Sequence, residues 1–108
     1  MITLENKKER AFDYGTQEFI EIHADGKKVG SMNVLHYESG ETHIDRIDID
    51  DDEQNKGYGT EALQMFPGAY VVPDNADAAR LYERIGSEVR VTDEFSSLDE
   101  GFGVYTID

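Results

Sequence analysis

The sequence predicts an α+β fold in which a twisted, mostly antiparallel central sheet of about six strands carries two main helices. Three observations predict it. Apolar β runs in the first half of the chain flank tight turns, as in a meander of antiparallel strands. Two helical patterns follow after residue 56, and further strand-like runs surround the second of them. The length of 108 residues fits one domain over residues 1–108.

The amino-terminal half predicts the meander. Residues 1–16 are polar and predict at most a short strand near residues 10–14. Residues 18–37 contain two β runs around Asp25-Gly26, a dipeptide typical of two-residue hairpin turns. Residues 38–41 (ESGE) predict a second turn before the next strand.

Residues 42–50 predict a third strand of this meander, and its apolar spacing is uneven. Ile44 and Ile47 lie three positions apart, whereas Ile47 and Ile49 lie two apart. One break in a period of two is what a β-bulge produces. We therefore expect a bulge in this strand.

The segments on either side of residues 73–86 predict short elements. Residues 57–66 predict a first helix of about ten residues, closed by Pro67-Gly68. Residues 69–72 (AYVV) predict a short buried strand. After the second helix, residues 88–92 and 103–107 predict strands on either side of an acidic loop.

The clearest helix pattern covers residues 73–86. Asp74 or Asn75 can cap its start, and Gly86 predicts its end. One face is apolar and consists of Ala78, Leu81, Tyr82 and Ile85.

The chain is strongly acidic, with a net charge of −14, and has no cysteine. The missing cysteines exclude disulfides, thiolate metal sites and a cysteine nucleophile, and they fit a cytoplasmic location. We expect no metal site, and no apolar run is long enough to span a membrane. The charge should repel nucleic acid and anionic lipid and attract cationic partners. Solubility, adaptation to a salty cytoplasm and mimicry of DNA's charge are explanations that acidity alone leaves open.

A Gly-x-Gly pattern, Gly57 and Gly59, stands behind Lys56 where the third strand gives way to the first helix. Backbone N–H groups at a helix start are unpaired and carry partial positive charge, so they can bind a phosphate. Glycines remove the Cβ atoms that would block its approach. An acidic chain can therefore still hold a pyrophosphate on residues 57–60. A plain glycine-rich turn is the alternative, which the short pattern alone favours.

Two longer motifs occur in order on these elements. The segment DDDEQNKGYGTEAL, residues 50–63, resembles motif A of the GNAT N-acetyltransferase superfamily, Gln/Arg-x-x-Gly-x-Gly/Ala after a strand, and is most similar to its histone-type branch. The segment NADAARLYERIGS, residues 75–87, resembles motif B, with Ser87 in place of the usual Phe. The matching residues are Gln54, Gly57 and Gly59 in motif A, and Asn75, Ala78, Leu81, Tyr82 and Gly86 in motif B.

The resemblance implies an N-acetyltransferase whose cofactor is acetyl-CoA, on a GNAT-like acyl-CoA N-acyltransferase fold. The pantetheine arm of acetyl-CoA would lie against the bulged strand, at residues 47–49, and the pyrophosphate of acetyl-CoA would lie on residues 54–60. The CoA arm would also contact Asn75. The implied cofactor-binding residues are Ile47, Asp48, Ile49, Gln54, Asn55, Lys56, Gly57, Tyr58, Gly59, Thr60, Asn75 and Ala78.

The resemblance also implies the catalytic groups. Tyr82 would be the general acid that protonates the departing thiolate, and a core aromatic is the alternative. Attack on a thioester requires a neutral amine, so a general base is needed as well. Histone-type members carry this base eleven residues ahead of the motif's Gln, where this chain has His43, with Asp45 two residues on. An imidazole titrates near the working pH. A surface histidine is the alternative for His43, and water held by backbone carbonyls is an alternative base.

The chain departs from the family on the acceptor side. The family's first two helices have no room in residues 1–17, and the helix after motif A stops at Pro67. We therefore expect an acceptor side that is open, or completed by a second copy in a homodimer. An open acidic cleft suits a protein lysine, an N-terminal amine or a polyamine-like acceptor. A catalytically degenerate acidic binding module or decoy is the alternative function.

Overall fold

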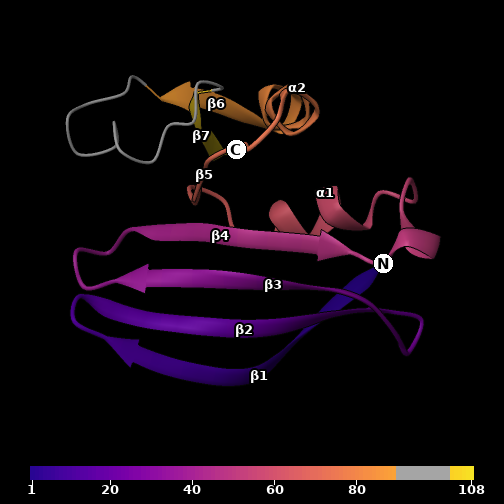
Figure 1. Cartoon of the computed structure of the whole chain (residues 1–108), viewed down its shortest axis with the longest axis horizontal. Coiled ribbons are helices and arrows are strands. Elements are labelled where there is room, and N and C mark those ends of the chain that lie inside the picture. Colours follow the sequence, from indigo (N-terminus) through magenta and orange to yellow (C-terminus); the bar gives the residue numbers. More distant parts are fainter. Residues whose placement is uncertain (90–102) are drawn as a thin grey trace.

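A computed structural model describes residues 1–89 and 103–108, and its strands form one seven-stranded sheet in the order β1-β2-β3-β4-β5-β7-β6 (Figure 1). The first four strands are an antiparallel meander, and β4 and β5 are parallel. The elements are β1 (Ile2–Phe12), β2 (Gly15–Ala24), β3 (Lys27–Tyr37), β4 (Thr42–Ile49), η1 (Asp51–Glu53), α1 (Tyr58–Leu63), β5 (Tyr70–Val71), α2 (Ala76–Ile85), β6 (Gly86–Val89) and β7 (Val104–Ile107). The predicted α+β fold is confirmed, with seven strands instead of about six.

The amino-terminal strand is the largest departure from the prediction. β1 pairs with β2 from Ile2 to Phe12, where the sequence predicted at most a short strand near residues 10–14. Most of its side chains are exposed, so the alternating apolar pattern that identifies a half-buried strand is missing. The ladder with β2 holds β1 in place, and the Ile2 N–H also donates a hydrogen bond to Glu61 Oε1 of α1 at 2.9 Å.

The predicted hairpin between β2 and β3 is confirmed. Asp25 and Gly26 both have positive φ, 53° and 79°. Two consecutive left-handed residues define the turn whose twist matches that of antiparallel strands, and Asp-Gly tolerates this geometry.

The core lies between the meander and α1. Ile22, Met32 and Val34 are almost inaccessible and belong to one apolar cluster with Ala62 and Leu63 of α1. Because side chains alternate along a strand, the neighbours of these residues point to the opposite face of the sheet.

The first helix is shorter than predicted. α1 ends at Leu63, three residues before the predicted end at Phe66. The chain continues in tight turns, in which the Met65 N–H donates to the Ala62 carbonyl and the Phe66 N–H to that of Leu63. These turns lead into Pro67 and the left-handed Gly68.

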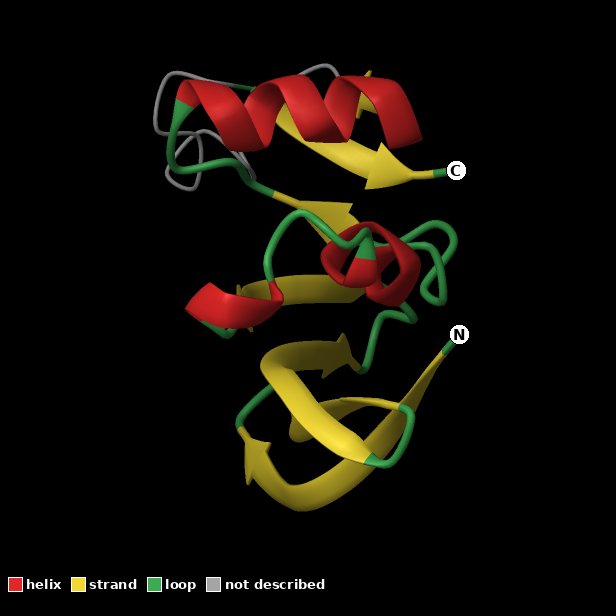
Figure 2. Ribbon diagram, turned by 90° about the vertical axis from the view of Figure 1, so that its right-hand side faces the viewer, coloured by secondary structure: helices red, strands yellow, loops and turns green. Residues whose placement is uncertain are grey.

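The second helix starts and ends where the sequence predicts. Asn75 caps α2 by accepting a hydrogen bond from the Ala78 N–H at 2.8 Å. The helix packs on β6 and β7 (Figure 2). Gly86 ends the helix and begins β6 without a connecting loop, and a Cβ there would come within 2.2 Å of the Thr106 carbonyl oxygen. Close packing, and not a left-handed turn, is therefore what requires glycine here.

The carboxy-terminal strands differ slightly from the prediction. β6 begins at Gly86, two residues earlier than predicted. Residues 90–92 of the predicted strand, and the acidic loop after them, lie outside the described residues. None of the described helices combines the length and the apolar character needed to cross a membrane.

Candidate active site

β4 and β5 are hydrogen-bonded over a very short distance and then separate. Among the described residues they pair only through His43 with Tyr70 and Ile44 with Val71. Figure 1 shows the meander below this contact, and β5, β6, β7 and α2 above it. From Asp45 onward, the side of β4 that faces β5 has no paired strand in the described chain. Its backbone groups can therefore bind another polar chain.

The predicted bulge lies at the same point. Val34 pairs with Ile44 and Asn33 pairs with Arg46, so Asp45 is the extra residue. The bulge between Ile44 and Ile47 is confirmed. Residues 47–49, where the sequence placed the pantetheine arm on the bulged strand, lie after the bulge and pair regularly with β3, so the expectation that the bulge exposes their backbone is wrong.

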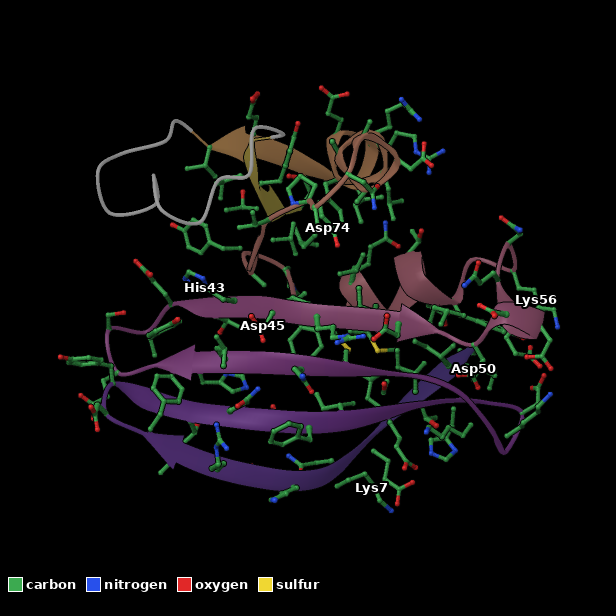
Figure 3. The ribbon with its side chains drawn as sticks, viewed as in Figure 1. Lys7, His43, Asp45, Asp50, Lys56 and Asp74 are labelled. Carbon is green, nitrogen blue, oxygen red and sulfur yellow. The ribbon has the colours of Figure 1, made fainter. Side chains whose placement is uncertain are left out.

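A cleft of about 590 Å³ lies where the two strands separate. It brings together the three residues that the sequence proposed for catalysis, His43, Asp45 and Tyr82. Asp74, which precedes α2, also lines it, and Figure 3 shows this residue across from His43 and Asp45 on β4. The remaining lining residues are Leu35, Tyr37, Ile44, Arg46, Ile47, Asp48, Tyr70 and Val72.

His43 is largely enclosed by polar and aromatic neighbours. Its side chain is 12% exposed, and its Nε2 lies 3.3 Å from Glu41 Oε2. The ring centroid lies 4.7 Å from that of Tyr37 and 5.0 Å from that of Tyr70. An imidazole is one of the side chains that can act as a general base.

Tyr82 is a buried residue of α2, 9% exposed, with its ring 6.3 Å from that of Tyr105. Burial, and to a smaller extent the Asp74 carboxylate, raise the pKa of Tyr82 above its ordinary value of 10.0. The phenol therefore stays protonated at neutral pH. It can donate a hydrogen bond or a proton into the cleft, and it cannot serve as a base there.

The loop between β4 and α1 has the backbone shape that the glycine pattern suggested. Asn55 and Gly57 have positive φ, 66° and 83°, and Gly57 is the N-cap of α1. Apart from its two chain neighbours, no described residue has an atom within 4 Å of the position that a Cβ on Gly57 would take. Within the helix, the Glu61 N–H donates to the Gly57 carbonyl at 3.0 Å, so the preceding N–H groups lack an intrahelical acceptor. This arrangement fits a phosphate group.

The same loop is anchored by contacts that the sequence did not reveal. Gln54 Nε2 donates to the Ile49 carbonyl oxygen at 3.0 Å. The Glu53 carboxylate is almost fully buried and contacts Lys27 Nζ at 2.5 Å and Lys56 Nζ at 2.9 Å. Hydrogen bonds from Lys27 and then Lys56 lower the pKa of Glu53, and Glu53 raises the pKa of both lysines. Lys27 lies 26 residues away, on the β2–β3 hairpin, so no local pattern could indicate this contact.

Other proposed cofactor residues have local structural roles. Asn75 uses its Oδ1 to cap α2 and donates from Nδ2 to Asp74 Oδ1 at 3.0 Å, and Ala78 packs against the core. Ile49 also packs against the core, 3.5 Å from the position of a Cβ on Gly59. Neither these residues nor residues 54–60 line the cleft, whereas Ile47 and Asp48 do.

One cluster outside the cleft has ligand atoms at metal-binding separations. Within the described residues, the side-chain ligand atoms of Glu5, Glu21 and His23 lie within 4.8 Å of one another. His23 Nε2 lies 3.2 Å from Glu5 and 3.1 Å from Glu21, so the three side chains also satisfy one another without an ion. None of them lines the cleft.

The sequence model of the Acetyltransferase (GNAT) family matches residues 3–86, which is more than half of the chain and includes β1 through α2. The chain belongs to the GNAT acetyltransferase family. Members of this family are N-acetyltransferases that use acetyl-CoA, so the predicted enzyme class and cofactor are confirmed for this GNAT protein at the level of the family. No curated protein matches the chain.

Proposed function

We propose that this GNAT protein transfers an acetyl group from acetyl-CoA directly to a primary amine of a cationic acceptor. Protein lysines, N-terminal amines and polyamine-like amines belong to this class. The observation that carries the proposal is that His43, Asp45 and Tyr82, which come from β4 and α2, line one cleft where β4 and β5 separate.

Acetyl-CoA supplies a thioester, whose carbonyl carbon an amine can attack. The side of β4 that has no paired strand in the described part of the chain would hold the pantetheine arm at Asp45 to Asp48, since the Ile49 carbonyl already accepts from Gln54, and residues 54–60 would hold the pyrophosphate. The open space beside Gly57 and the N–H groups at the start of α1 support this assignment. Lys56 would contribute charge from a fixed position, since its ammonium group is held by Glu53.

The general base in this proposal is His43, with Asp45 or an ordered water as the alternative. The acceptor enters mostly as an ammonium ion and must lose a proton before it can attack. His43 would accept this proton, and Glu41, whose Oε2 lies 3.3 Å from its Nε2, would help to orient the ring. Asp45 projects from the bulge into the same cleft.

The general acid is Tyr82, acting mainly through a hydrogen bond. A thiol has a pKa of about 8.5, below the raised pKa of Tyr82. The phenol is thus a weaker acid than the thiol, and it stabilises the departing thiolate by donating a hydrogen bond more than by complete proton transfer. This predicts a moderate catalytic contribution.

The acidity of the cleft supports a cationic acceptor. Asp45, Asp48 and Asp74 line it, and Asp48 pairs with Arg46 through a 2.5 Å contact between Oδ2 and Nε, so the carboxylates of Asp45 and Asp74 give the cleft its negative charge. The net charge of the whole chain, −14, adds a long-range attraction for cations.

Thermal unfolding with and without acetyl-CoA tests the first step of this proposal. A ligand at a hundred times its Kd adds about 2.7 kcal/mol of stability. A stabilised protein that acetylates lysine or spermidine supports the enzyme. A protein that is stabilised neither by acetyl-CoA nor by CoA, and that acetylates no amine, would instead favour the alternative of an acidic docking module that retains only the fold.

A further inference from the structure

The direction of β4 determines which end of the cleft receives the acceptor. The proposed phosphate loop follows the carboxyl end of β4, and the bulge at Asp45 lies nearer its amino end. A cofactor held along this strand with its phosphates on residues 54–60 therefore has its acyl group directed toward the amino end. The acceptor amine must therefore reach that end of the cleft, which is lined by Tyr37, His43 and Tyr70.

A row of aromatic rings leads out of the cleft at this end. The ring of Tyr37 contacts that of His43 inside the cleft, with centroids 4.7 Å apart. On its other side, Tyr37 meets Phe12 of β1 edge-to-face, with centroids 5.6 Å apart. Phe12 does not line the cleft. Gly15 pairs with both Phe12 and Tyr37 and has no side chain to separate them.

A small amine would be accommodated between the cleft residues and would not reach Phe12. A polypeptide in an extended conformation is different, because side chains two positions apart point to the same side and are separated by roughly 6.6 Å. This spacing is close to the 5.6 Å between the rings of Phe12 and Tyr37. An acceptor lysine whose stem passes Tyr37 would therefore place the residue two positions away beside Phe12.

We infer that Tyr37 and Phe12 form an acceptor track for an extended polypeptide, with the lysine ammonium entering the cleft beside Tyr37 and an apolar side chain two positions away resting on Phe12. This inference rests on the proposed N-acetyltransferase function. Aromatic rings attract ammonium ions, and the carboxylates of Asp45 and Asp74 in the cleft complement the charge of the lysine. Phe12 supplies an apolar contact that recognises sequence near the lysine.

Two nine-residue peptides with a central lysine test the track, one with leucine at both positions two residues from the lysine and one with serine there. N-acetyl-lysine amide serves as the short amine. Calorimetry in the presence of CoA, which cannot react, measures binding, and thiol release from acetyl-CoA measures KM. The variants are Phe12→Ala, the milder Phe12→Leu, Tyr37→Leu and, as a control, Tyr14→Ala, which removes an exposed tyrosine from the adjacent turn.

The leucine peptide should bind the parent about five- to tenfold more tightly than the serine peptide, as expected for burial of one apolar side chain. Phe12→Ala should abolish this preference and leave the KM of N-acetyl-lysine amide unchanged, and Phe12→Leu should retain part of the preference. Tyr37→Leu should weaken binding of all three acceptors, whereas Tyr14→Ala should change none.

Equal binding of the two peptides by the parent, or a leucine preference that survives Phe12→Ala, would overturn the track. If N-acetyl-lysine amide is still acetylated in that case, the proposed function stands without it. If acetyl-CoA binds but no amine is acetylated or bound, the proposed function fails, and the track fails with it.

Discussion

Gly57 and Gly68 offer a matched pair for testing the phosphate assignment. Both have a φ of 83°, and a Cβ at either position would meet no atom of the described chain within 4 Å, its sequence neighbours aside. Valine at either site therefore suffers the same backbone strain and gains or loses few contacts. Only Gly57 lies at the start of α1, where the proposed pyrophosphate would approach the backbone.

Backbone strain should lower the melting temperature of both variants, whereas the steric effect on the phosphate should appear only in the acetyl-CoA affinity of Gly57→Val. A residue with a Cβ costs about 1–2 kcal/mol in the left-handed region. Each kcal/mol lowers the Tm by roughly 4–8 °C in a domain of about 100 residues, so both variants should melt about 4–16 °C below the parent. At 25 °C both should remain folded, provided that the parent has the usual stability of a small domain.

Acetyl-CoA affinity should then distinguish the two variants. Gly57→Val places branched methyl groups in the space that the phosphate would use, and we expect at least about a tenfold loss of affinity, or 1.4 kcal/mol. Gly68→Val should bind as tightly as the parent. Isothermal titration calorimetry of the two variants at matched temperature measures this difference. Equal affinities would refute the phosphate assignment, whatever the change in Tm.

Three further substitutions test the catalytic groups and the loop anchor. Tyr82→Phe keeps the ring and removes the donor, so turnover should fall by roughly tenfold to a thousandfold, and unchanged turnover would reduce Tyr82 to a core residue. His43→Gln keeps much of the side-chain shape but cannot take up a proton, so it should lower the rate with little change in acetyl-CoA affinity, and an unchanged rate in the variant would exclude His43. His36→Gln is the control, because His36 pairs with Glu18 outside the cleft. Because the pKa of Glu53 is lowered in the folded protein, its ion pairs stabilise the fold fully at pH values above the ordinary carboxyl pKa of about 4.3. This stabilisation is lost as the pH falls through the lower pKa of the folded state. Glu53→Gln should therefore lower the Tm at pH 7 but not at about pH 2, and an equal deficit at both pH values would contradict the role of its charge.

Local signals predicted the elements that depend on local chemistry. Asp25-Gly26 indicated a hairpin because the dipeptide accepts the left-handed turn that the strands require. Asn75 indicated a helix start because its side chain can bond the Ala78 N–H three residues on. The break in apolar period between Ile44 and Ile47 indicated a bulge in this strand, and the extra residue is Asp45.

Contacts between distant segments were not predictable in this way. β1 is held by pairing with β2, so its polar side chains carry no periodic pattern. Lys27 meets Glu53 across 26 residues of sequence. Tyr37 lines the cleft because the register of β3 and β4 pairs Leu35, two positions earlier on the same strand, with His43. Such a register is known only once the strands are seen to pair.

The candidate site also combines residues that local sequence motifs indicated with residues that only the folded structure brings together. The two motifs indicated Tyr82 and the glycines of the loop, whereas Asp74 was considered only as a helix cap. Its position across the cleft from His43 and Asp45 depends on β5, which pairs with β4 and leads the chain to the start of α2. Spatial proximity of this kind has no signature in the spacing of residues along the chain.

Mass spectrometry of a lysine peptide incubated with acetyl-CoA and this GNAT protein tests the central claim most directly, with parent and Tyr82→Phe proteins measured side by side. The account predicts that the peptide gains one acetyl group on the lysine amine, that free CoA appears in equal amount, and that Tyr82→Phe slows both processes by the same factor. The account would be contradicted if the protein binds acetyl-CoA tightly but acetylates no peptide, spermidine or N-terminal amine, and releases no CoA above the uncatalysed rate.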